Sequence, residues 1–173
     1  SDGEYDFENK IELENYKNIV SKIFGGKSLT YNIYTAKEEL KMGFSAKDTA
    51  EIFSLEINQQ TPILFYGSQH FARTTDVQIK SGGMSQDFLV KTEGSGILFL
   101  KVYGTLIEKL IDSKKPIYVD EDALIAFEEG IEYEWITGGV KKLITSGEGG
   151  LFKLSGKGKI WIQSKDKIEY KKD

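Results

Sequence analysis

Cysteine is absent from this chain of 173 residues, and histidine occurs once, as His70. Without cysteine the protein has no disulfide bonds and no thiolate ligands for a metal ion. One histidine falls short of the two or three that a cupin-type iron, manganese or zinc site requires. We interpret His70 as a surface or hydrogen-bonded residue beside a turn, which is the commoner role of a lone histidine.

Nucleophilic catalysis also lacks its usual residues. The chain has no cysteine nucleophile, no Gly-x-Ser-x-Gly elbow and only His70 to serve as a base. We therefore assign no catalytic, cofactor-binding or metal-binding residue, and we expect no cofactor. An all-carboxylate metal site stays open, although no Asp-x-Asp-x-Asp loop occurs in the sequence.

Acidic residues outnumber basic residues, and the sequence contains no long apolar run. The formal net charge is −4 and the pI is near 5.2, which disfavours nucleic-acid binding because phosphates require a basic face. The longest apolar run, at 97–100, ends at Lys101 and is far shorter than the ~20 residues of a transmembrane helix. The acidic residues 1–4 are unlike a secretory signal, so we expect a cytoplasmic protein, or a mitochondrial one in a eukaryote.

Lysine is concentrated near the C-terminus. Residues 151–173 hold seven lysines: Lys153, Lys157, Lys159, Lys165, Lys167, Lys171 and Lys172. We interpret them as a solvated strand edge followed by a polar tail at 165–173. A surface for anionic partners is the alternative, as is peripheral membrane association that also uses a helix at 14–24.

Glycine, by contrast, occurs eighteen times, and aromatic and β-branched residues fall in short runs. Such runs between glycine turns are typical of a nearly all-β protein. We predict strands at 29–34, 52–57, 63–66, 77–79, 88–92, 97–103, 117–119, 123–128, 131–137, 151–155 and 160–164. One short helix is predicted at 16–23, before Gly25-Gly26, and 36–42 is either a second helix or a charged turn. The length favours a single domain over 1–173.

Internal repetition is the strongest organisational signal. With a constant offset of 54, residues 52–79 match 106–133, and the two prolines, Pro62 and Pro116, coincide. With an offset of 62, the Gly-x-Gly segment at 94–96 matches the one at 156–158, and we predict each copy as a strand, a Gly-x-Gly turn and a second strand. We predict an A-B-A-B-A series of hairpins in which unit A opens with a glycine pair and unit B centres on a proline. Stacking buries the apolar faces in a β-sandwich or double-stranded β-helix.

The glycine and aromatic positions of the C-terminal half form a specific ordered set. They include Gly94, Gly96, Phe99, Gly104, Ala126, Phe127, Gly147, Gly149, Gly150, Phe152, Gly156, Gly158 and Trp161. This set resembles the family named for altered inheritance of mitochondria, and the likeness continues more weakly upstream to the region of residue 10. The chain departs from the family at Asp122-Ala123, where Gly-His is usual, and at Lys157, where proline is usual.

The resemblance implies a fold like that of the tryptophan-sensing RNA-binding attenuation protein, a double-stranded β-helix or β-sandwich that often forms symmetric oligomers. No activity is established for the family, so the resemblance assigns no site residue. Its mitochondrial members look like membrane-associated organisers of the inner membrane. We therefore predict a non-enzymatic oligomeric scaffold or binding protein that associates with itself, a trimer being one form, or with another protein. The alternatives are an RNA-binding module, by fold analogy, and a carboxylate-based enzyme.

Three further groups of residues could carry chemistry. The first is an acidic cluster of Asp120, Glu121, Asp122, Glu128, Glu129, Glu132 and Glu134. We interpret it as a solvated face, because glycosidase chemistry would need one carboxyl in an apolar pocket. The glycine-rich segments at 138–142 and 146–150 match no phosphate-binding motif and are interpreted as turns. The aromatic residues Phe99, Phe127, Tyr133, Trp135, Phe152 and Trp161 are interpreted as core rather than as a stacking surface.

Overall fold

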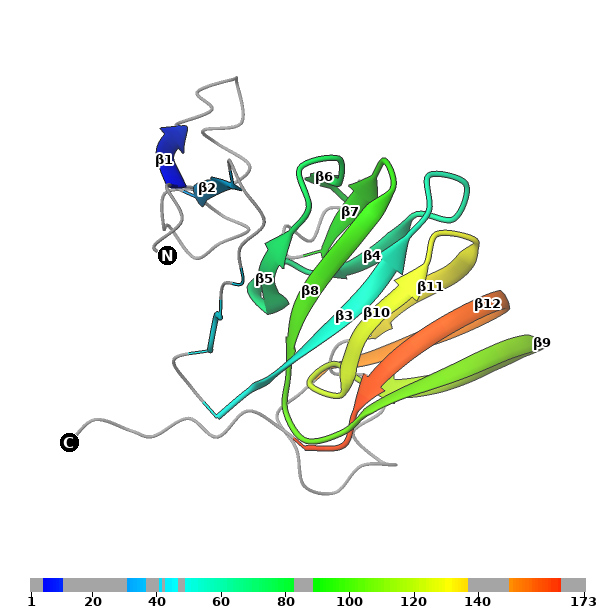
Figure 1. The fold of residues 1–173 in the computed structure, drawn as a ribbon. Helices are drawn as coiled ribbons and strands as arrows, with labels where there is room; N and C mark the ends of the chain where they lie inside the picture. Colours follow the sequence, from blue (N-terminus) through cyan, green and yellow to red (C-terminus); the bar gives the residue numbers. More distant parts are fainter. Residues whose placement is uncertain are drawn as a thin grey trace.

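The computed structural model describes residues 5–10, 31–36, 41, 43–46, 49–82, 89–136 and 150–165. Within these ranges the chain is built almost entirely of antiparallel β-strands (Figure 1), which confirms the all-β prediction. A 3-10 turn, η1, covers Gly67–Gln69. The predicted helix at 16–23 and most of the segment 36–42 lie outside the described residues, as do the glycine-rich segment 138–142 and the tail beyond residue 165.

The strands run in chain order from β1 to β12. They are β1 Tyr5–Lys10, β2 Tyr31–Ala36, β3 Glu51–Ile57, β4 Ile63–Tyr66, β5 His70–Arg73, β6 Gln78–Ser81, β7 Leu89–Glu93, β8 Gly96–Val102, β9 Leu106–Asp120, β10 Leu124–Glu128, β11 Ile131–Ile136 and β12 Leu151–Gln163. Most predicted strands have a counterpart among them. The sequence patterns missed β1, β5 and residues 106–116 of β9, because charged residues interrupt the apolar pattern of each.

The described strands form three sheets. β1 pairs with β2 in a sheet of its own, and β3, β8 and β5 form a second sheet in that order. The third sheet has the order β11-β12-β10-β4-β7-β6, and the long strand β9 pairs with β12 over most of its length. Figure 1 shows β9 and β12 running side by side as two long strands.

The Gly-x-Gly segments do not close hairpins, contrary to the sequence-based prediction. β7 and β8 flank the first segment, yet β7 pairs with β4 and β6, whereas β8 pairs with β3 and β5 in another sheet. The second segment lies inside the continuous strand β12, at a shift in its register against β9. Gly94 and Gly156 have φ angles of +88° and +101°, which only glycine adopts without strain. They therefore redirect the chain without reversing it.

The pairing registers follow the same two offsets as the sequence. Leu64 pairs with Lys91, and Tyr118, 54 residues after Leu64, pairs with Lys153, 62 residues after Lys91. The same shift relates three other pairs of partners: Phe53↔Leu100 to Ile107↔Ile162, Ala72↔Phe99 to Ala126↔Trp161, and Ile79↔Thr92 to Tyr133↔Leu154. The irregularity between β5 and β8 also recurs between β10 and β12.

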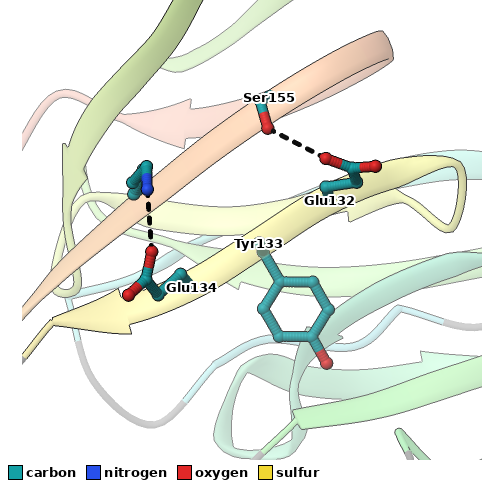
Figure 2. A pocket seen from close by; sticks show the side chains of 5 residues that line it. Glu132, Tyr133, Glu134 and Ser155 are labelled. Atoms are coloured by element: carbon teal, nitrogen blue, oxygen red, sulfur yellow. Dashed lines mark hydrogen bonds and ion pairs between the residues drawn. The ribbon is translucent and has the colours of Figure 1, made fainter.

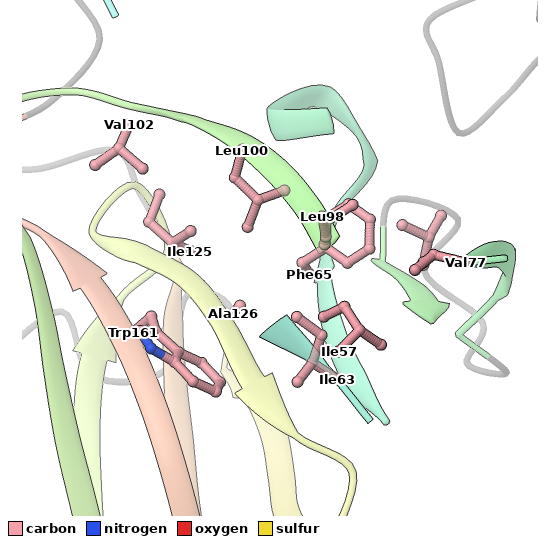
Figure 3. Packing of buried hydrophobic residues seen from close by; sticks show 11 residues of the cluster. Ile57, Ile63, Phe65, Val77, Leu98, Leu100, Val102, Ile125, Ala126 and Trp161 are labelled. Atoms are coloured by element: carbon pink, nitrogen blue, oxygen red, sulfur yellow. The ribbon is translucent and has the colours of Figure 1, made fainter. Parts of the chain in front are cut away.

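Two apolar cores lie on opposite sides of the central pair β4–β10. Phe65 of β4 and Ile125 of β10 belong to the first core, which also holds Leu98 and Leu100 of the smaller sheet (Figure 3). Leu64 and Phe127 belong to the second core, with residues of β11 and β12. Because both faces of β4 and β10 are buried, these strands read as uninterrupted apolar runs in the sequence. Burying each large side chain contributes about 1.5–3 kcal/mol.

The prolines lie at positions where the strand ladder requires no N–H donor. Pro62 precedes β4, and Pro116 lies within β9 between the two stretches that pair with β12. β9 pairs with β12 on one side, and no other strand of the described residues pairs with it. An edge position tolerates the missing N–H of proline.

Candidate functional site

The two glutamates of β11 are among the residues that line a shallow hollow of about 180 Å³ on the β11–β12 surface. Glu132 and Glu134 share one face of β11, as the strand alternation predicts, and both are exposed. Figure 2 shows them beside β12, where Ser155 Oγ contacts Glu132 Oε2 at 3.4 Å and Lys153 Nζ lies 2.8 Å from Glu134 Oε2. The ion pair raises the pKa of Lys153, through its hydrogen bond with Glu134.

The remaining acidic residues serve mostly as local acceptors or ion-pair partners. Glu121 Oε2 accepts a hydrogen bond of 3.0 Å from the indole Nε1 of Trp135, and Glu128 Oε2 accepts one of 2.9 Å from the backbone of Lys159. Glu129 pairs with Lys91. A general acid needs an apolar pocket that stabilises its protonated form. These carboxylates instead contact cations and donors, which is the arrangement of a structural, partly solvated surface.

The lysines of β12 are neutralised by acids on adjacent strands. Lys153 pairs with Glu134, Lys159 Nζ lies 2.9 Å from Glu108 Oε1, and Lys157 Nζ lies 3.6 Å from Asp112 Oδ2. The bond with Lys159 lowers the pKa of the Glu108 carboxyl, and Trp161 Nε1 donates to the same group at 3.0 Å. Alternating charges of this kind leave little net potential for phosphate groups.

His70 is partly buried, and its Nε2 atom is neither exposed nor hydrogen-bonded to a described residue, a detail that the interpretation from sequence did not include. It begins β5, and its Nε2 is buried without a hydrogen-bond partner among the described residues. Burial lowers the pKa of His70 to about 4, and the positive charges of Arg73 and Lys101 lower it further. No group of three or more histidine, aspartate or glutamate side chains within the described ranges is arranged to hold a metal ion.

The turn that follows β9 is acidic, in contrast to the cationic surroundings of His70, and its charges act on Tyr66 of β4. Burial raises the pKa of the Tyr66 hydroxyl, and the negative charges of Glu121, Asp122 and Asp120 raise it further. Tyr66 packs edge-on against Phe152, at 6.0 Å between ring centroids. The pKa shift of Tyr66 thus identifies an acidic region at the turn after β9. The pKa shift of His70 identifies a cationic region around β5.

The most unusual surface of the described chain is the outer side of β9. Its side chains include Leu110, which is 69% exposed, and Tyr118, which is 57% exposed. Ile107 of the same strand is 38% exposed. Sequence reasoning identified 117–119 as a strand but not its exposure. Under the offset of 54, Tyr118 is the equivalent of Leu64, which is buried. The repeat by itself would therefore suggest that Tyr118 is buried too.

The aromatic residues largely follow the prediction of a core role. Phe127, Phe152 and Trp161 are buried, and Tyr133 and Trp135 pack against the second core. Gly150 is needed here for close approach, because a Cβ atom would lie 2.1 Å from Trp135 Nε1. Phe99 is only partly buried. These rings are therefore not arranged as an open stacking surface.

Comparison with protein families gives a match over residues 1–165 to the family described as mitochondrial biogenesis AIM24. The chain belongs to the mitochondrial biogenesis AIM24 family. This confirms the resemblance that its glycine and aromatic positions indicate. No curated protein matches this AIM24-family chain.

Among solved structures, the AIM24-family chain is similar to a crystal structure of a Streptococcus pyogenes protein from a structural genomics programme. The TM-score is 0.66 at 18% sequence identity, and the match covers 94% of this chain and 77% of the other. At that identity the likeness establishes a shared fold. No helix of the described residues combines the length and apolar character required to cross a membrane.

Proposed function

We propose that this protein is a non-enzymatic scaffold or binding protein that assembles with further copies of itself. The observation that carries the proposal is the edge strand β9, on which the large apolar side chains of Leu110 and Tyr118 are exposed. An edge strand with exposed apolar side chains is a template for pairing with another chain. The carboxylates, by contrast, are engaged in ion pairs and hydrogen bonds, which favours a structural over a catalytic role.

The shared offsets support a second element of the proposal. We infer that residues 51–102 and 105–164 are two copies of one structural unit, each wound as part of a double-stranded β-helix. Four kinds of strand pairing recur between the two segments with unchanged register. Units of this kind bury their faces by stacking on a neighbour, and this favours continuation of the stack beyond one chain.

Sedimentation velocity with light scattering on the full chain tests the proposal. We expect species at multiples of the 19.5 kDa chain mass, with larger species at higher protein concentration. A strictly monomeric protein from micromolar to hundreds of micromolar concentration would contradict it. A filter-binding titration with single-stranded RNA is the companion measurement, and tight salt-dependent binding there would favour the RNA-binding alternative.

A further inference from the structure

One strand pair inside the chain shows how two units join. β4 pairs antiparallel with β10, with the register Ile63↔Glu128, Leu64↔Phe127 and Phe65↔Ala126. β4 belongs to the first unit and β10 to the second, so this pair is the seam between them. Both strands are buried on their two faces, and Leu64 is only 4% exposed. The seam is therefore a well-packed interface with a defined register.

The counterparts of these two strands have no such neighbour. The offset of 54 relates β4 to residues 117–120 of β9, and β10 to β5. Within the described chain, β5 pairs only with β8, and the 117–120 part of β9 pairs only with β12. The strands β1 and β2, which are the described part of the N-terminal segment, hydrogen-bond to each other instead of covering either edge.

These two edges, with which no further described strand pairs, differ in charge. Both are antiparallel edge strands with partly buried apolar residues, Val119 on β9 and Ala72 on β5, and Tyr118 on β9 is largely exposed. Arg73 is the cation on the β5 strand, and the acidic turn 120–122 follows the β9 edge. Complementary charges favour encounter of the two surfaces and fix their orientation.

We propose that two copies of this chain join head to tail, with β5 of one copy paired antiparallel to residues 117–119 of β9 of the other. The register of the internal seam gives the partners: Ile117 opposite Thr74, Tyr118 opposite Arg73 and Val119 opposite Ala72. This inference rests on the proposed self-association and specifies its surface. Because the two edges differ, the contact is heterologous and repeats from copy to copy, which gives a ring or an open chain.

Disulfide trapping tests this pairing directly, because the natural chain has no cysteine. The experiment mixes two full-length variants, Tyr118→Cys and Arg73→Cys, under mild oxidation. Directly opposite residues of antiparallel strands have Cα atoms about 4.5–5.5 Å apart, within the disulfide range. We expect a covalent dimer in the mixture at a yield roughly tenfold above that of either variant alone, since pairing raises the effective thiol concentration.

The matched control replaces the partner thiol by Lys109→Cys, which is exposed on the same strand. It lies nine residues from position 118, about 30 Å along the strand, so it should not trap Arg73→Cys. A second in-register mixture, Val119→Cys with Ala72→Cys, repeats the test at a neighbouring pair. Far-ultraviolet circular dichroism and thermal melts of each variant show that it retains the fold.

Each other result overturns the pairing. If the chain self-associates but the in-register mixtures trap no more than the control, the proposed function stands and this interface is wrong. If the chain is monomeric at every concentration, both are wrong.

Discussion

The seam β4–β10 and its counterparts, β5 and the 117–120 part of β9, are the most instructive comparison in this molecule. The positions correspond through one offset and the pairings keep one register, yet Leu64 is buried and Tyr118 is 57% exposed. The difference follows from neighbours, since β4 has a strand on each side and residues 117–120 have a strand on one side only. Equivalent positions of the repeat therefore contribute differently to the stability of the fold, depending on which strands lie beside them.

The largest contrast is expected from truncating the paired positions Leu64 and Tyr118. Leu64→Ala should lower the free energy of unfolding by about 2–5 kcal/mol, because it opens a cavity in the second core. Tyr118→Ala should change it by about 0.5 kcal/mol or less in the monomer, since the side chain is largely exposed. Urea denaturation at low protein concentration measures the free energy of unfolding of both variants. Equal losses would show that the two positions do not differ in burial.

The two equivalent glycines should also differ. Gly94→Ala places a Cβ atom 2.1 Å from the backbone oxygen of Asp76, so the strain of a positive φ, about 1–2 kcal/mol, adds to a displaced backbone, about 1–3 kcal/mol. At Gly156 the nearest atom to such a Cβ is 3.5 Å away, so Gly156→Ala should show the backbone strain alone. Thermal unfolding of both variants tests the order, and a larger loss at Gly156 would refute it.

The pH dependence of stability should separate β5 from β10. Because the fold lowers the pKa of His70 to about 4 from an ordinary 6.5, the unfolded chain binds the proton more tightly. The contribution of neutral His70 is complete above pH 6.5 and is lost as the pH falls toward 4, by about 3 kcal/mol in total. His70→Leu, which installs the residue found at position 124 of β10, should remove this component.

The check is a set of urea titrations at several pH values between 7 and 4, for the natural chain and for His70→Leu. The carboxylates titrate in both proteins, so the difference between the two curves isolates His70. If the curves run parallel over this range, the pKa of His70 is not depressed in the fold.

The smallest contrast concerns a buried hydroxyl that the second unit lacks. Thr92 Oγ1 accepts a hydrogen bond of 3.0 Å from the backbone N–H of Ile63, whereas Leu154 occupies the equivalent position of β12. Thr92→Val should cost about 1–3 kcal/mol, because it removes this acceptor from a buried donor. Calorimetry measures the loss, with Thr105→Val at an exposed position as the control. No difference between the two variants would show that Ile63 finds another acceptor.

Sequence reasoning succeeded where burial is two-sided and local. The apolar runs of β4 and β10 were predicted with almost their observed bounds, because every residue of such a strand must be apolar. It failed at β5, His70–Arg73, which mixes polar and apolar residues and forms an edge. It also failed at the Gly-x-Gly segments, because a positive φ shows that the chain bends without showing in which direction it continues.

The candidate surface divides in the same way. The alternation of β11 was enough to place Glu132 and Glu134 on one face, but their ion-pair and hydrogen-bond partners on β12 depend on a strand twenty residues further along the chain. The burial of His70 Nε2 was not predicted, because it depends on packing around β5 that no local pattern encodes. A lone histidine beside a turn has the same sequence signature whether its ring is covered or exposed.

The sequence by itself determined the all-β class, the positions of most strands and the two offsets that relate the halves of the chain. These depend on residue type and spacing, since glycine, proline and alternating apolar residues restrict the backbone locally. The tertiary structure alone decided which strand edges are covered, that Gly94 leads from one sheet to another, and that Tyr118 is exposed where Leu64 is buried. Those properties arise from contacts between residues far apart in the sequence, so residue identity at one position cannot specify them.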